Sequence, residues 1–266
     1  MKNKKPVSVY EQKGLKVVNY GDAAELILHG EIVDDTDAGW LKRYGEDDVG
    51  YCYPDKVRKA LGEIQGKPID VHIASDGGNV AAGIAIYNML IEHKTTYKVP
   101  VNVYIDAWAA SIASYIAMAG DKIYIPTNGF IMIHNPIGGA FGDSQYLRAV
   151  ADWLEKLRNM LAEAYANRAA EGKTVDDFLA AMDAETWYTA QEAAETFKDV
   201  EIIDDANRLE AVACFSGLKT APEAITQAHA EAEAARLESE KAEAEAKRVA
   251  DIKAAVQAVL ERSVTE

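Results

Sequence analysis

Val101–Ala119 reads VNVYIDAWAASIASYIAMA, and the expected fold follows from this stretch more than from any other. Residues 101–105 alternate apolar and polar side chains, which predicts a β-strand, whereas 111–119 is rich in Ala, Ile and Ser, which predicts a helix. Ser111 therefore stands at a strand-to-helix turn, exposed at the sheet edge and at the positive end of the helix dipole. Such a residue is a candidate nucleophile, although Ala and Ser also serve simply to pack a tight helix against a sheet.

Similar patterns flank this stretch on both sides. Further strands are predicted at 15–18, 24–32, 69–74, 122–125, 130–134 and 200–203. Further helices are predicted at 54–64, from 79 to about 91, and at 143–170, 174–182 and 190–197. The acidic, turn-rich segment 34–50 is assigned no single conformation. Strands that alternate with helices predict an α/β fold with a largely parallel sheet covered by helices.

Composition narrows the class of protein. The chain has 266 residues, of which 49% are hydrophobic, so it can bury a sizeable core. No apolar run reaches the roughly 20 residues of a membrane span, and the basic start at 1–6 has no apolar segment behind it. We therefore expect a soluble protein that is not secreted. A net charge of -15 disfavours nucleic acids and acidic membranes as partners.

The two cysteines give no sign of a metal or redox site. Cys52 and Cys214 lie far apart in the sequence and belong to no metal-binding spacing or Cys-x-x-Cys motif. We expect ordinary reduced thiols, and no cofactor or metal is implied.

The composition changes after Gly217. From Pro222 onward the chain is rich in Ala, Glu, Lys and Arg, which favours a helix, but between 227 and 248 Leu237 is nearly the only large apolar side chain. Without a regular apolar seam a coiled coil is not assured. Two interpretations stay open: a solvated or partly disordered helix, and a coiled coil or scaffold segment that binds a partner.

Nucleophilic acyl transfer requires a base beside the serine. His134 is the candidate base, because it ends an apolar strand and is followed by a turn, Asn135-Pro136-Ile137-Gly138-Gly139. The other histidines lie within or near strands, at His29 and His72, or on polar helix faces, at His93 and His229.

The same chemistry needs an acid to orient the base and donors for an oxyanion. Asp183 and Glu185 both precede the aromatic pair Trp187-Tyr188, and either is a candidate acid. The backbone amides of Gly78 and Ile112 are the expected oxyanion donors, since a glycine lets the backbone approach a bound carbonyl.

The chain order Ser, His, acid and four motifs in series closely resemble the Clp protease proteolytic subunit family over residues 22 to 206. Details favour its phage branch, the ClpP-like head maturation (prohead) proteases. The motifs are Ser75-Asp76-Gly77-Gly78, Ala109-Ala110-Ser111, Met132-Ile133-His134-Asn135-Pro136-Ile137-Gly138-Gly139 and Thr189-Ala190-Gln191-Glu192-Ala193. The branch's own versions are 82–88, 134–136, 139–143 and 183–187.

The resemblance implies a ClpP/crotonase-like spiral of β-β-α units with a long projecting helix at 143–170 that mediates contact between rings of a homo-oligomer. It implies Ser111 as nucleophile and His134 as general base, with Gly78 and Ile112 as the oxyanion hole. The family has aspartate two residues before the aromatic anchor. This chain has Glu185 there, so Glu185 is the expected third member of the triad and Asp183 the alternative acid.

A second departure from the family lies in the oxyanion loop. Asp76 stands where the housekeeping enzyme usually has proline, which changes the rim of this loop.

Together these inferences divide the chain into an N-terminal segment at 1–21, a ClpP-like serine protease domain at 22–208, and a linker with a charged helical tail at 209–266. The expected activity is that of a serine endopeptidase that cleaves phage capsid or scaffold proteins during head maturation, in the host cytoplasm or assembling prohead. The tail is expected to bind capsid protein.

Other functions remain open at this point. A ClpP-like fold could act mainly as a capsid scaffold or assembly protein, or as a general ClpP-type peptidase. A Ser/Lys protease of the signal-peptide-peptidase type is disfavoured, because none of the motifs contains a lysine and no membrane anchor is found. A crotonase-type acyl-CoA enzyme is disfavoured because its chemistry needs no ordered Ser, His and acid.

Overall fold

The computed structural model describes residues 8–12, 15–43 and 50–204. The chain divides into two compact units, residues 1–220 and 221–266, and every described residue belongs to the first. The predicted linker and charged tail at 209–266, Cys214 and His229 lie outside the described residues. Within the described part of the chain, no helix combines the length and the apolar character that crossing a membrane requires.

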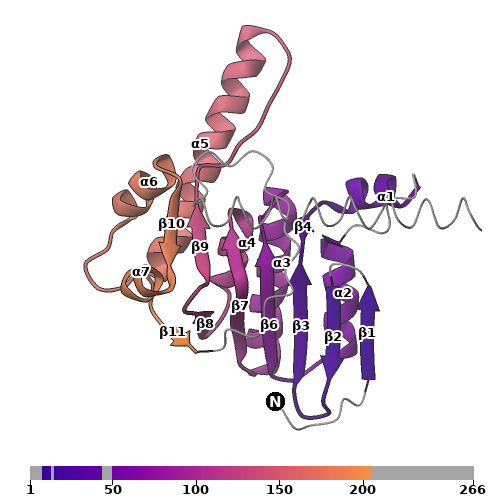
Figure 1. Ribbon diagram of the computed structural model, residues 1–266. Helices are drawn as coiled ribbons and strands as arrows, with labels where there is room; N and C mark the ends of the chain where they lie inside the picture. The colour runs from indigo at the N-terminus through magenta and orange to yellow at the C-terminus, as the bar shows by residue number, and fades with distance from the viewer. Residues whose placement is uncertain (1–7, 13–14, 44–49, 205–266) are drawn as a thin grey trace, which may run out of the picture. The chain divides into compact units, whose positions relative to one another are not determined.

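A mixed β-sheet forms the centre of the described unit (Figure 1). Along the sheet its strands are β1 (Ser8–Gln12), β2 (Leu15–Asn19), β3 (Ala24–His29), β6 (Ile69–Ser75), β7 (Val101–Ala110), β8 (Ile123–Pro126) and β11 (Val200–Ile203). Neighbours from β3 to β11 run parallel, whereas β1, β2 and β3 pair antiparallel. The predicted parallel α/β sheet is therefore confirmed, with an antiparallel edge added.

Two more strands leave the main path at the end of β7. The first half of β7 pairs with β8, and its last residues, 108–110, pair in parallel with β9 (Phe130–Ile133). On its other side β9 pairs antiparallel with β10 (Thr186–Thr189). The strands β9 and β10 thus extend the same sheet as a branch from the end of β7.

Seven helices of the described residues accompany the sheet. They are α1 (Asp35–Arg43), α2 (Pro54–Glu63), α3 (Val80–Tyr97), α4 (Ile112–Ala117), α5 (Ser144–Asn167), α6 (Val175–Asp183) and α7 (Ala190–Thr196). A separate two-stranded parallel sheet joins β4 (Glu31–Ile32) to β5 (Tyr51–Cys52). Figure 1 shows α5 projecting away from the sheet, with the segment that precedes it running alongside.

The core lies between one face of the sheet and the helices α2, α3 and α4. In β3 the side chains of Ala24, Leu26 and Leu28 are buried and alternate with half-buried ones, as expected for a strand with one face on a core. Val57 of α2 and Leu90 of α3 are fully buried in the same cluster. The α/β class predicted from the alternating patterns is the class observed.

The opposite face of the sheet carries a buried polar network. Asp106 Oδ1 accepts a hydrogen bond from His72 Nδ1 on the neighbouring strand β6 at 2.9 Å, and its Oδ2 accepts one from His29 Nε2 on β3, one strand further, at 3.0 Å. These contacts hold the pKa of Asp106 at about 2 despite its burial, which alone would raise it. Both histidines are thereby engaged far from Ser111.

Several local predictions need correction. The predicted strand 24–32 breaks at Gly30, whose φ of 91° ends β3 before β4. Segment 34–50 contains α1, because Asp34 Oδ1 accepts from the amides of Thr36 and Asp37, both at 2.8 Å, at its start. His93 is buried, not on a polar face, and its Nε2 lies 2.9 Å from the carbonyl oxygen of Lys67.

Candidate active site

Ser111 joins β7 to α4 in a strained backbone conformation. Its φ is 55° and its ψ -129°, a region that residues with a Cβ rarely adopt. The strain persists because both sides of the peptide are held. The amide of Ser111 donates to the Met132 carbonyl at 3.0 Å, and its own carbonyl accepts from Ser114 Oγ at 2.6 Å. The hydroxyl is consequently turned out of the regular path of strand and helix.

Tyr165 supports this turn from α5. Its hydroxyl lies 2.8 Å from Ser114 Oγ, so the side chain that holds the Ser111 carbonyl is itself held. Burial raises the pKa of Tyr165 beyond its ordinary value, and the phenol stays neutral. The sequence gives no signal for this support, because Tyr165 reads there only as one member of an apolar helical stripe.

His134 reaches Ser111 because β9 runs parallel to the end of β7. Ala110 pairs with Met132, so the residues that follow both strands emerge side by side. His134 Nε2 lies 2.7 Å from Ser111 Oγ, within hydrogen-bond reach. The structure therefore brings together the two residues that the sequence analysis names as nucleophile and base.

The surroundings of His134 favour its neutral form. Burial lowers the pKa of the imidazole below its ordinary value, and the negative charge of Glu185 partly opposes this effect. A neutral imidazole has a free lone pair and can accept a proton from a hydroxyl. His134 is thus able to act as a base at neutral pH.

Glu185 lies in the turn directly before β10, beside the end of β9 that leads to His134. β10 pairs with β9 in a register that places Thr186 opposite Ile133, so Glu185 and His134 are the next residues beyond that pair. Glu185 has a φ of 51°, and its amide donates to the Met182 carbonyl at 3.2 Å, which closes the turn after α6. The carboxylate is near enough to His134 to raise its pKa.

Asp183, the alternative acid, has different partners. Asn135 Nδ2 donates to its Oδ1 at 2.8 Å, and Arg158 Nη2 donates to both of its oxygens at 2.8 Å. These contacts lower the pKa of Asp183, the hydrogen bond from Asn135 most strongly. Arg158 is a residue that the sequence analysis does not single out.

The loop after β6 carries two glycines, of which Gly77 lies against the serine and Gly78 against Ile32. The amide of Ile32 donates to the Gly77 carbonyl at 2.8 Å, and the Ile32 carbonyl accepts from the amide of Asn79 at 2.7 Å. In such a parallel bridge the amide of the intervening residue, Gly78, points away from Ile32. A Cβ on Gly78 would lie 2.1 Å from the Ile32 oxygen, and one on Gly77 would lie 2.7 Å from Ser111 Cβ. The close approach therefore requires glycine at both positions.

The amide of Ile112 completes the surroundings of the hydroxyl. It is the first amide of α4, and amides in the first turn of a helix have no partner within the helix. It follows Ser111 directly, so it can donate to an oxygen bound beside the serine.

Asp76 lies at the rim of this glycine loop. Trp108 Nε1 donates to its Oδ1 at 2.6 Å, while its Oδ2 is buried and has no hydrogen-bond partner among the described residues. Burial raises the pKa of Asp76 to about 7, the bond from Trp108 opposes this, and the charge of Glu31 adds to it.

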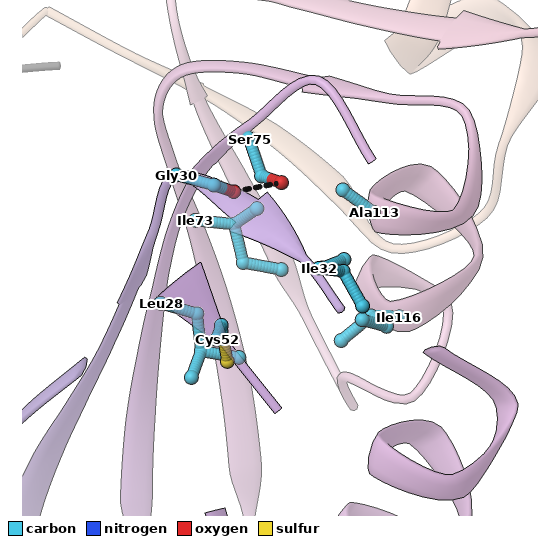
Figure 2. A pocket seen from close by; sticks show the side chains of 8 residues that line it. All are labelled: Leu28, Gly30, Ile32, Cys52, Ile73, Ser75, Ala113 and Ile116. Atoms are coloured by element: carbon cyan, nitrogen blue, oxygen red, sulfur yellow. Dashed lines mark hydrogen bonds between the residues drawn. The ribbon is translucent and has the colours of Figure 1, made fainter. Parts of the chain in front are cut away.

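A small cavity lies behind the loop, and Figure 2 shows its lining. Its volume of about 10 Å³ is close to what one water molecule requires, so it is too small for a substrate. Ser75 Oγ donates to the Gly30 carbonyl at 2.6 Å at one end (Figure 2). Cys52 lines the cavity, and burial raises the pKa of its thiol to about 12, so it remains an unreactive thiol at neutral pH.

Metal ligands do not cluster in this part of the molecule. Within residues 8–12, 15–43 and 50–204, no group of three or more His, Cys, Asp or Glu side chains is placed to hold a metal ion. The candidate site thus consists of a serine, an imidazole and a carboxylate, together with the backbone amides of Gly78 and Ile112.

Comparison with known proteins assigns this arrangement to a family. A family model described as Clp protease matches residues 60–197, more than half of the chain. The chain belongs to the Clp protease family. The matched residues include Ser111, His134, Glu185 and the glycine loop.

Three proteins of the Clp family are similar to this chain. The ATP-dependent Clp protease proteolytic subunit of Pleurastrum terricola is 34% identical over 140 residues, 52% of this chain and 67% of the relative. Proteolytic subunit 1 of Leifsonia xyli subsp. xyli is 32% identical over 158 residues, 59% of this chain and 77% of the relative. The subunit of Ligilactobacillus salivarius is 32% identical over 131 residues, 48% of this chain and 64% of the relative.

Family membership confirms two of the predictions from the sequence. The fold is the ClpP-like α/β fold, and the chain is a serine-type peptidase. The individual roles of Ser111, His134 and Glu185, and the phage branch, stay predictions.

Proposed function

We propose that this Clp-family chain is a serine endopeptidase in which Ser111 is the nucleophile, His134 the general base and Glu185 the residue that orients the base. The observation that carries this proposal is the 2.7 Å contact between His134 Nε2 and Ser111 Oγ. In the reaction, Ser111 Oγ attacks the peptide carbonyl while His134 Nε2 accepts its proton. The imidazolium then gives this proton to the leaving amine. In the second half of the reaction, His134 takes a proton from the attacking water and returns it to Ser111 Oγ, so that water hydrolyses the acyl-enzyme.

The tetrahedral intermediate needs hydrogen-bond donors for its oxygen. The backbone amides of Gly78 and Ile112 are proposed to supply them. The amide of Gly78 points away from its bridge partner Ile32, and the amide of Ile112 is the first amide of α4. The short distance from Gly77 to Ser111 brings the glycine loop to the nucleophile.

Glu185 is proposed as the third member of the triad in preference to Asp183. The charge of Glu185 acts on His134, whereas Asp183 is bound by Asn135 and Arg158. The left-handed turn at Glu185 and its position directly beyond the Thr186–Ile133 pair support a role for a glutamate where the family has aspartate.

The substrates are proposed to be phage capsid or scaffold proteins, cleaved in the host cytoplasm or the assembling prohead without an ATP-driven unfoldase. This part rests on the motif variants at 82–88, 134–136, 139–143 and 183–187, which resemble the prohead protease branch. Incubating the purified protein with the capsid protein of its own phage, with and without ATP, tests it. ATP-independent cleavage at defined sites is expected, and an intact capsid protein beside a labelled active site would favour a general ClpP-type peptidase.

Contact between rings of the homo-oligomer is proposed to use α5. The first half of this helix and the segment before it expose large apolar side chains, among them Phe141, Leu147 and Trp153. Exposed apolar groups of this kind mark surfaces that bind another protein surface. Analytical ultracentrifugation of the full chain is expected to show a closed oligomer, and Trp153→Glu is expected to weaken it.

The charged tail at 209–266 is proposed to bind capsid protein. Deleting residues 218–266 is expected to reduce incorporation of the protease into proheads, and unchanged incorporation would refute this role.

A fluorophosphonate probe followed by mass spectrometry tests the catalytic proposal. We expect a single labelled site at Ser111, and no labelling of Ser111→Ala or of protein unfolded beforehand. A folded, assembled protein that is not labelled even with capsid protein present would instead support the alternative function, a ClpP-like fold that acts as a capsid scaffold or assembly protein.

A further inference from the structure

Arg158 of α5 connects three segments of the chain beside the proposed active site. Its Nη2 donates to Oδ1 and Oδ2 of Asp183, both at 2.8 Å, and its Nε lies 3.1 Å from Asn135 Oδ1. Asn135 Nδ2 donates in turn to Asp183 Oδ1 at 2.8 Å. These three side chains, Arg158, Asn135 and Asp183, close a ring of hydrogen bonds that we call the Arg158 clamp.

The clamp holds the chain next to both His134 and Glu185. Asn135 follows His134 directly, and Asp183 is the last residue of α6, two positions before Glu185. Arg158 Nη2 also lies 3.4 Å from the carbonyl oxygen of Leu179, so the guanidinium contacts α6 at two points. The β9–β10 ladder holds the base and the acid from one side, and the clamp holds them from the other.

The turn between Asp183 and Glu185 needs such external support. Glu185 adopts a φ of 51°, a left-handed conformation that is strained for a residue with a Cβ. Two backbone hydrogen bonds close this turn: the amide of Ala184 donates to the Ala180 carbonyl at 3.1 Å, and the amide of Glu185 donates to the Met182 carbonyl at 3.2 Å. A side-chain clamp on the preceding residue therefore restricts where Glu185 can point.

The clamp is better suited to positioning than to stabilising the fold. The Asp183 side chain is 55% exposed, and exposed ion pairs contribute little to the free energy of folding. Its geometry, however, is specific, because a planar guanidinium binds both carboxylate oxygens and the Asn135 oxygen at once. The Asp183 carboxylate, whose pKa these contacts lower, is ionised at neutral pH, as the clamp requires.

We propose that Arg158 is a positioning residue for the peptidase reaction, which acts through Asn135 on His134 and through Asp183 on Glu185. The inference rests on the proposed catalytic roles of His134 and Glu185. Arg158 does not touch the nucleophile, so its removal leaves all reacting groups in place but lets the base and the acid shift.

The rate at which a fluorophosphonate labels Ser111 tests this inference in the full-length protein. We compare wild type, Arg158→Ala and Arg158→Lys, with Arg58→Ala as the matched control. Arg58 contacts Asp55 at 3.5 Å on the surface of α2, remote in sequence from the clamp. The melting temperature and the oligomeric state of every variant are measured alongside.

Arg158→Ala is expected to slow labelling about tenfold or more, because a displacement of about 1 Å in a catalytic group costs up to about 100-fold in rate. Arg158→Lys should recover part of the loss, since it restores the charge without the planar fork. The acidic limb of the pH profile of the labelling rate should move to lower pH in Arg158→Ala. The reason is that a displaced Glu185 raises the pKa of His134 less. Arg58→Ala should label at the wild-type rate.

Labelling of Arg158→Ala at the wild-type rate per folded molecule would overturn the inference, as would a loss fully explained by unfolding or by dissociation of the oligomer. If Arg158→Ala does not fold, Asp183→Asn opens the clamp from α6, and the same slowing is expected. A normal rate in Asp183→Asn would then reject the role. A wild type that is never labelled would instead reject the proposed function on which the inference rests.

Discussion

Trp108 Nε1 donates a 2.6 Å hydrogen bond to Asp76 Oδ1, and the second oxygen of this carboxylate is buried without a hydrogen-bond partner among the described residues. An oxygen in this setting favours a proton over a charge. Asp76 stands where the housekeeping enzymes of the family usually have proline, directly before Gly77 and Gly78.

Asp76→Asn should change how stability depends on pH. Because the pKa of Asp76 is raised to about 7, the folded protein binds a proton here that the unfolded chain has lost. The free energy of unfolding that this proton contributes is lost as the pH rises from about 4 to about 7. The melting temperature of Asp76→Asn should therefore exceed that of wild type by more at pH 8 than at pH 5, as checked by thermal melts across about pH 5 to pH 8.

Asp55→Asn is the control for this comparison. Asp55 is exposed on α2 and Lys59 lowers its pKa, so its titration lies below this pH window. The difference in melting temperature between Asp55→Asn and wild type should stay constant across this pH range. A constant difference for Asp76→Asn as well would contradict the raised pKa of Asp76.

Glu185→Gln should move the acidic limb of the labelling profile to lower pH. The negative charge of Glu185 raises the pKa of His134 against the stronger effect of burial, so removing the charge lowers this pKa further. The plateau rate should also fall by at least about tenfold, because the amide no longer holds the required imidazole tautomer. Glu185→Asp, which restores the family's residue, should keep the limb within about half a pH unit of wild type. An unshifted limb in Glu185→Gln would exclude Glu185 as the neighbour of the base.

Ser111→Gly should be more stable than Ser111→Ala. Both variants lack the hydroxyl, but only alanine keeps a Cβ at a φ of 55°. Relief of this strain is worth about 1 kcal/mol, more than the extra entropy that glycine loses on folding. Chemical denaturation of the two variants measures the difference directly. If the alanine variant were the more stable, the backbone at Ser111 would not be strained.

Gly78→Ala should abolish labelling and destabilise the fold. Its Cβ would lie 2.1 Å from the Ile32 carbonyl oxygen, so the loop must shift away from the ladder that positions it. Gly172→Ala is the matched control, because Gly172 also has a positive φ, 86°, but a Cβ there meets nothing within 4 Å. That variant should lose only about 1 kcal/mol of stability and keep its labelling rate. Equal labelling of the two variants would rule out the loop as part of the site.

The residues of the site could be named from the sequence because their signals are local. Ser111 and His134 each follow an apolar strand and precede a turn, and the glycines after β6 are visible as a pair. The parallel pairing of β7 with β9 then brings the ends of both strands together, as the α/β pattern predicts. The alternation of strand and helix patterns likewise predicts the α/β fold class that is observed.

Features that depend on distant partners were missed. β10 has only four residues and is a strand because it pairs with β9, more than 50 residues earlier in the chain. Arg158 contacts residues 23 and 25 positions away, so no helical spacing reveals it. The motif itself names Glu185 as the expected acid and Asp183 as the alternative, and this choice stays a prediction.

The placement of β9 between β7 and β10 has a consequence for biosynthesis. The serine follows β7, the imidazole follows β9 and the carboxylate precedes β10, three adjacent strands that the ribosome makes in this order, and the last strand ends at Thr189. A nascent chain that has emerged only as far as α6 already holds Ser111 and His134 but lacks Glu185 and β10. On the proposed roles, the triad is therefore complete only after β10 has been made and has paired with β9.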